Sequence, residues 1–156
     1  MRVLTDHLRS TVASEGERLA ALTDEAASRR PGPGKWSPKE IIGHLVDSAS
    51  NNHVRFVRAL LEDHLSFPGY DQYEWVRVQH YNERSWPELL GLWTAMNSGI
   101  ASLIEAMPPE ALSRQRTTHS LDRIAWRTVP ADQPVTLEYL VSDYVDHLEH
   151  HLSQIR

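Results

Sequence analysis

The sequence carries the same helix-start signal twice, and this repeated signal constrains the fold more than any other feature. In the first copy, Ser37 stands where an N-cap side chain is needed, a proline follows at the first helical position, and Glu40 completes a capping box. The second copy is Ser-Trp-Pro-Glu at 85–88. Apolar residues at three- and four-residue spacing follow each copy, which predicts helices at 38–63 and 86–107.

Two further helices are predicted from hydrophobic spacing. Apolar residues recur every three or four positions over 3–28 and again over 137–155, where Thr136 can act as the N-cap. A run rich in proline and glycine at 30–35 separates the first of these helices from the next. Four helices of this length predict an all-α four-helix bundle, and we expect residues 1–156 to form a single domain.

The two long connections between these helices differ in character. The first part of the connection at 64–85 is rich in aromatic residues: Phe67, Tyr70, Tyr73 and Trp75. These rings either cap one end of the core or belong to a functional loop, and we expect a short helix at 71–79. The connection at 108–135 is irregular, with one helical turn predicted at 109–112 and an extended piece at 123–128.

Composition and charge limit the functions that this chain can have. Hydrophobic residues make up 40% of the chain and charged residues 24%, as in ordinary globular proteins. A net charge of −5 gives no basic surface for nucleic acid, and we expect no membrane span. The absence of cysteine leaves His, Asp and Glu as the strong metal ligands. The stretch Met1–Ser10 lacks the apolar core of a signal peptide, so we expect a cytoplasmic protein.

The last predicted helix carries two histidines one helical turn apart, His147 and His151. Side chains four positions apart lie about 5–6 Å from each other, so two imidazoles can bind one metal ion and need only a third ligand. Their place at the edge of the apolar stripe favours this pair, although His150 could replace His151. Taken alone, such a pair is more often a solvated polar face.

A polar stripe runs along one side of the helix predicted at 38–63. Its members lie at offsets of three, four, seven and eleven residues from the first: His44, Asp47, Ser48, Asn51 and Arg55. Such a stripe is usually solvated. Because the opposite face of the helix is strongly apolar, the stripe would also suit the lip of an internal pocket.

Several short segments of the sequence form a pattern when they are taken together: Pro33–Ser37, His44–Ser48, Arg55-Phe56, Glu62-Asp63, Tyr70-Asp71, Trp75 and His147–Ile155. With these segments, nearly the whole chain resembles the DinB/YfiT-like superfamily of bacterial metal-binding four-helix bundles, and its YfiT-like branch most closely. The resemblance implies metal ligands at His44, His147 and His151, with further coordination sites left for water or substrate. Zinc or nickel is the expected metal.

The resemblance implies a metal-dependent enzyme and leaves its reaction open. Some members of the family resemble thiol S-transferases, in which bacillithiol, mycothiol or glutathione binds the metal as a thiolate and attacks an electrophile. The YfiT-like branch is instead described as metal-dependent hydrolases, and a third alternative is a non-catalytic metal-binding bundle. Leu148 stands where a zinc protease helix carries Glu after its first His, so we favour thiol transfer over attack by water.

Further site residues are predicted from the polar stripe and the resemblance. Asn51, Arg55 and Trp75 are candidates to bind a thiol cofactor or its acceptor. In a hydrolase, Asp47 or Asp143 would have to serve as the general base. We expect a small-molecule substrate, no nucleic-acid or membrane partner, and a homodimer, since members of the family often pair.

Overall fold

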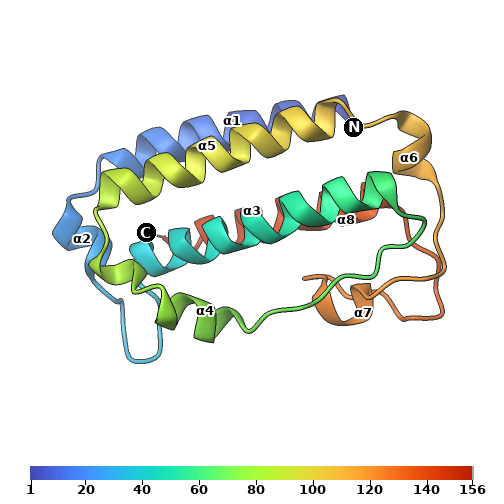
Figure 1. Cartoon of the computed structure of the whole chain (residues 1–156). Helices are drawn as coiled ribbons and strands as arrows, with labels where there is room; N and C mark the ends of the chain where they lie inside the picture. Colours follow the sequence, from blue (N-terminus) through green and yellow to red (C-terminus); the bar gives the residue numbers. More distant parts are fainter. Residues whose placement is uncertain (156) are drawn as a thin grey trace.

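The computed structural model describes residues 1–155, and its regular elements are all helices (Figure 1). The four long helices are α1 (Arg2–Ala20), α3 (Pro38–Leu61), α5 (Trp86–Glu105) and α8 (Leu137–Leu152). Short helices lie in the connections: α2 (Asp24–Ser28), α4 (Gln72–Val78), the 3-10 helix η1 (Tyr81–Glu83), α6 (Pro109–Ser113) and α7 (Leu121–Ile124). No helix in this part of the chain combines the length and the apolar character that crossing a bilayer requires.

The long helices form two antiparallel pairs, α1 with α5 and α3 with α8, and α3 also packs against α5 (Figure 1). The connection between α3 and α5 returns the chain to the end of the bundle where α3 began, so α3 and α5 run in the same direction (Figure 1). The predicted all-α four-helix bundle is confirmed. This arrangement brings the first turns of α3 beside the last turns of α8.

The helix α3 is central to the bundle, and its start confirms the predicted capping box. Ser37 Oγ accepts the Glu40 N–H at 3.2 Å, and the Glu40 carboxylate accepts the Ser37 N–H at 2.8 Å. Every residue from 39 to 49 is buried, including His44 and Asp47. The polar side chains of such a helix need partners or an internal cavity, because burying them unpaired costs free energy.

The single helix predicted at 3–28 is wrong, because the chain forms two helices there. The first helix, α1, ends at Ala20, and Thr23 caps the separate helix α2 by accepting the Ala26 N–H at 3.1 Å. A capping residue inside the apolar repeat therefore ends one helix and starts another. The last helix, α8, also ends earlier than predicted, at Leu152.

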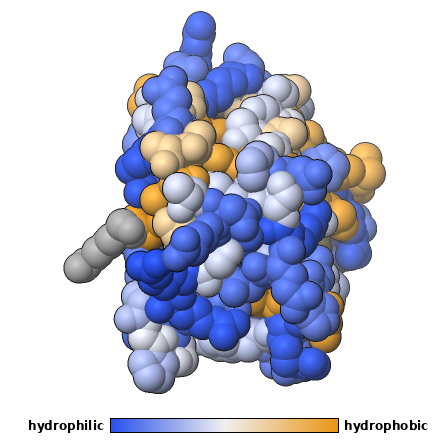
Figure 2. Space-filling model, turned by 90° about the vertical axis from the view of Figure 1, so that its left-hand side faces the viewer, coloured by the Kyte–Doolittle hydropathy of each residue, from blue (hydrophilic) through white to orange (hydrophobic). Residues whose placement is uncertain are grey.

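Polar contacts hold together the end of the bundle where α3 begins, and the surface at this end is mostly hydrophilic (Figure 2). Ser85 is the N-cap residue of α5 as predicted, but within residues 1–155 its side chain makes no capping hydrogen bond. The Trp86 N–H instead donates to the Asp24 carboxylate at 3.0 Å. Lys39 Nζ donates to the same carboxylate at 2.9 Å, so one side chain connects α2, α3 and α5.

The connections match the prediction in part. The short helices predicted at 71–79 and 109–112 are confirmed as α4 and α6. The extended piece predicted at 123–128 is wrong at its start, where two backbone N–H groups donate to Ser120 O and close the short helix α7. Leu121 is completely buried, so packing against the core favours this turn over an extended chain.

Tyr81 packs directly against α3 at Gly43, and a methyl group added at this glycine would overlap the Tyr81 ring. We predict that Gly43→Ala lowers the free energy of unfolding by about 1–3 kcal/mol, as measured by urea denaturation. Gly99→Ala in α5 is the matched control. Its added methyl group has no neighbour within 4 Å, so this change should be neutral or stabilise the protein by up to about 1 kcal/mol. A Gly43→Ala protein as stable as the parent would contradict this packing.

Candidate metal centre

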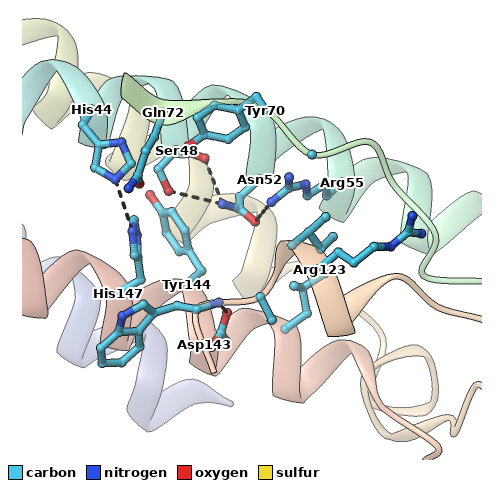
Figure 3. A pocket seen from close by; sticks show the side chains of 15 residues that line it. His44, Ser48, Asn52, Arg55, Tyr70, Gln72, Arg123, Asp143, Tyr144 and His147 are labelled. Atoms are coloured by element: carbon cyan, nitrogen blue, oxygen red, sulfur yellow. Dashed lines mark hydrogen bonds between the residues drawn. The ribbon is translucent and has the colours of Figure 1, made fainter. Parts of the chain in front are cut away.

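The antiparallel contact between α3 and α8 brings three histidines together. His44 lies near the start of α3 and faces His147 near the end of α8 (Figure 3). Together with His151, each offers one ring nitrogen to a cluster in which these atoms all lie within 4.8 Å of one another. His44 Nε2 and His147 Nε2 are 3.2 Å apart. Two nitrogens on one tetrahedral zinc ion lie about 3.3 Å apart when Zn–N bonds are about 2.0–2.1 Å, so the spacing suits a shared metal ion.

The protein keeps these imidazoles in the neutral form that binds metals. Burial, together with the neighbouring histidine rings, lowers the pKa of His44 and of His147 to about 3. Burial also lowers the pKa of His151. Within residues 1–155, His44 Nδ1 is buried without a hydrogen-bond partner. A neutral imidazole has a free lone pair, so this donor set fits a divalent metal ion.

Trp36 covers one side of the histidine cluster. Its ring centroid lies 5.2 Å from that of His44 and 6.3 Å from that of His151. The sequence pattern did not identify Trp36 as a site residue. Trp36 directly precedes Ser37, the N-cap residue of α3. An apolar residue at this position often packs over the first turns of the helix, so Trp36 could have been predicted to lie near His44.

Trp126, on the segment after α7, borders the cluster from another direction. Its ring centroid lies 6.4 Å from that of His147 and 5.1 Å from that of His150. His150 is exposed and is not part of the cluster, so the structure favours the pairing of His147 with His151. No periodic pattern could have located Trp126, because it lies in an irregular connection.

A cavity of about 220 Å³ extends from the histidine cluster along α3 (Figure 3). Its wall on α3 consists of residues at intervals of four, four and three positions: His44, Ser48, Asn52 and Arg55. The other walls come from the connection after α3, from the α7 region and from α8, and they include Tyr70, Gln72, Arg123, Trp126, Asp143, Tyr144 and His147. Three members of the polar stripe of α3, His44, Ser48 and Arg55, therefore face this cavity.

Of the predicted substrate-binding residues, Arg55 lines this cavity, whereas Asn51 and Trp75 do not. The Asn51 side chain donates to Asp47 O at 2.9 Å, and the neighbouring Asn52 stands in the cavity wall instead. The Trp75 ring lies 4.7 Å from the Tyr70 ring, and Tyr70 is the residue that reaches the cavity. The aromatic connection thus contributes to the site.

The two candidate bases, Asp47 and Asp143, both have structural partners. Asp47 is outside the cavity wall, and its Oδ1 accepts hydrogen bonds from Tyr81 Oη and Gln79 Nε2, each at 2.7 Å. Asp143 lines the cavity, and its two oxygens accept the N–H groups of Trp126 at 2.9 Å and Arg127 at 2.7 Å. Burial raises the pKa of both carboxyl groups. Asp143 therefore fixes the segment after α7 against α8.

Comparison with known proteins agrees with this architecture. A sequence model of the DinB superfamily matches residues 15–155. "Putative metal-dependent hydrolase YfiT" of Bacillus subtilis is 27% identical over 150 residues, which cover 95% of this chain and 78% of that protein. A "Putative metal-dependent hydrolase" of Geobacillus thermodenitrificans is 25% identical over 155 residues, which cover 99% of this chain and 78% of that protein.

A solved structure supports the fold independently. It is described as "YfiT from Bacillus subtilis is a probable metal-dependent hydrolase with an unusual four-helix bundle topology". The match has a TM-score of 0.79 at 20% sequence identity and covers 99% of this chain and 82% of that chain. At this identity the likeness establishes the arrangement of the helices alone.

Metal binding can be tested through thermal stability. A metal ion that binds only the folded state stabilises it by mass action, so added zinc or nickel should raise the melting temperature of the parent. His147→Ala should remain folded and lose both stoichiometric metal uptake and this response. His150→Ala, which changes an exposed histidine outside the cluster, should keep both. Equal responses in the two variants would refute the ligand assignment.

The low pKa values predict that the metal-free protein loses stability as the pH falls. Unfolding returns His44 and His147 to a pKa near 6.5, so between about pH 3 and pH 6.5 the unfolded state binds more protons than the folded state. The free energy of unfolding should decrease from pH 7 to pH 5, by up to about 1.4 kcal/mol per pH unit for each histidine. In His147→Gln, the free energy of unfolding, measured by denaturant titration at each pH, should fall less steeply as the pH decreases. An unchanged slope would show that this ring titrates normally.

Proposed function

The chain belongs to the DinB superfamily, and from this we propose that it is a divalent-metal-dependent enzyme that transfers a low-molecular-weight thiol to an electrophilic acceptor. His44, His147 and His151 would hold the metal, and zinc or nickel suits a ligand set of imidazoles. The observation that supports the proposal is the convergence of three neutral imidazoles, two of which, those of His44 and His147, line one end of a cavity.

Three neutral ligands leave the charge of a divalent cation uncancelled, so the metal would stabilise the thiolate form of a coordinated thiol. Bacillithiol, mycothiol and glutathione are the thiols that we consider. The thiol proton leaves to solvent, the sulfur forms a bond to the electrophilic carbon, and the leaving group departs with its electron pair. The cavity beside His44 would hold the rest of the thiol or its acceptor.

The placement of the carboxylates favours a thiol over water as the nucleophile. Attack by water usually benefits from a general base, whereas a thiolate needs none once it has formed. Asp47 is held by Tyr81 and Gln79 outside the cavity wall. Asp143 already accepts two backbone N–H groups.

A metal-dependent hydrolase is the second candidate, because the Bacillus subtilis and Geobacillus thermodenitrificans relatives both carry that description. In this case Asp143 would be the base, since it lines the same cavity as His147. A purely structural metal site is less well supported. Such a site normally completes its coordination with four protein ligands, whereas three histidines gather here beside a cavity.

Thiol conjugation tests the proposal directly. With zinc or nickel, one of the three thiols and 1-chloro-2,4-dinitrobenzene, the protein should form the thioether and release chloride, which is measured by absorbance. The rate should need both metal and thiol, because the metal holds the sulfur as thiolate. His44→Ala, His147→Ala and His151→Ala should each reduce the rate to the uncatalysed background.

The control for this assay is His150→Ala, which should keep the parent rate because His150 is outside the cluster. A hydrolase would behave differently. It would cleave an ester or amide without thiol, and an added thiol would inhibit it by occupying the metal. Metal-dependent hydrolysis without any conjugation would therefore replace the first proposal with the second.

A further inference from the structure

Arg55 places a guanidinium group in the cavity wall several turns of α3 away from His44 (Figure 3). Arg55 is buried, with only 6% of its surface exposed. Its Nη1 donates to Asn52 Oδ1 at 3.4 Å and its Nη2 donates to Pro68 O at 3.1 Å. A guanidinium has five N–H donors, so three of them have no acceptor among residues 1–155.

The cavity gives this cation little compensating charge. Burial lowers the pKa of Arg55, and Tyr70 and Asp143 oppose this shift from a distance. Asp143 already accepts the N–H groups of Trp126 and Arg127, and its Oδ1 lies 3.7 Å from Arg127 Nε. The two acceptors of Arg55, Asn52 Oδ1 and Pro68 O, are neutral, and a buried charge without an opposite charge in contact is unfavourable, so an anion would stabilise a guanidinium at this place.

The cationic end and the histidine end belong to the same cavity. The Arg55 guanidinium contacts Asn52, which lies eight residues after His44 on α3. Eight residues of α-helix span about 12 Å. Ser48 lines the wall between the two ends. One elongated small molecule can therefore contact both ends at once.

We propose that Arg55 binds a carboxylate of the ligand whose other end reaches the histidine cluster. This inference rests on the proposed function, because a metal ion defines the second end. Paired N–H groups of a guanidinium match the two oxygens of a carboxylate, and Asn52 holds the group in orientation. Arg123 also lines the cavity, but its side chain is 75% exposed and lies 3.6 Å from the Asp122 carboxylate, so Arg55 supplies the buried charge. One buried guanidinium suits a singly charged carboxylate better than a phosphate dianion. The substrate class is therefore a small carboxylic acid that carries the reactive thiol or the electrophile.

The competing explanation is that Arg55 serves only as a clamp, since it also donates to Pro68 O in the connection after α3. The two explanations differ in what they predict for ligand preference. If Arg55 only holds the connection against α3, the negative charge of a ligand has no effect on its affinity. A carboxylate site discriminates between two ligands of equal length that differ only at that end.

Two thiols test this preference on the whole protein loaded with cobalt(II). These are 6-mercaptohexanoate and its neutral counterpart 6-mercaptohexan-1-ol, which have the same chain length and differ only at the end remote from the sulfur. Thiolate binding to cobalt produces a charge-transfer absorption band, so titration gives a dissociation constant for each thiol. The carboxylate should bind at least about tenfold more tightly, as expected for hydrogen bonds to a charged group.

Three variants assign the preference to Arg55. Arg55→Met should reduce the ratio of the two dissociation constants to about one, whereas Arg55→Lys should retain part of it because the charge remains. Arg58→Gln is the matched control and should keep the full ratio. Arg58 lies on the same helix, but its side chain is 41% exposed and pairs with Glu62 outside the cavity.

The possible outcomes separate the two proposals. If neither thiol produces the charge-transfer band, the proposed function fails. If both thiols bind equally well to the parent, the metal assignment stands and the carboxylate site is refuted. If both Arg55 variants fail to fold, the comparison of the two thiols on the parent decides alone.

Discussion

The burial of the first half of α3 is the constraint on which the rest of the structure depends. Residues 39–49 are buried, so each polar side chain among them needs a partner or an internal space. Asp47 finds its partners in Tyr81 and Gln79, which fixes the chain before α5 against α3. His44 Nδ1 has no hydrogen-bond partner among residues 1–155, and His44 Nε2 lies 3.2 Å from Nε2 of His147 on α8. One buried helix thus anchors a connection and also supplies the first member of the histidine cluster.

The long connection between α3 and α5 affects both the topology and the site. Because it returns to the starting end of the bundle, α5 runs parallel to α3, and α8 is the antiparallel neighbour on the other side (Figure 1). Only this direction of α8 places its last turns beside the first turns of α3. The same connection carries Tyr70 into the cavity wall and provides Pro68 O for Arg55. Topology and site geometry therefore have a common origin.

Local signals predicted the helices well and the cavity only in part. Caps and apolar spacing are local properties, so the start of α3 and the HxxxH pair on α8 could be read directly from the sequence. Thr23 was missed, because the apolar repeat continues past it. Asn51 and Asn52 could not be told apart, since helix rotation depends on packing. Trp126 lies in an irregular connection, and its position depends on the hydrogen bond that its backbone N–H donates to Asp143, a residue 17 positions further along the chain.

The electrostatics of the cavity would allow a chain with a net charge of −5 to receive the anionic ligand that we propose. The net charge acts at long range and is screened by salt, whereas a buried group acts at contact in a low dielectric. The histidine end is neutral because burial removes protons from His44 and His147. The other end keeps the charge of Arg55, since a guanidinium stays protonated even when it is buried. A divalent metal ion would make both ends positive, so a ligand with a thiolate at one end and a carboxylate at the other would place one negative charge at each end, which matches the charge of Arg55 and cancels half of the charge of the metal.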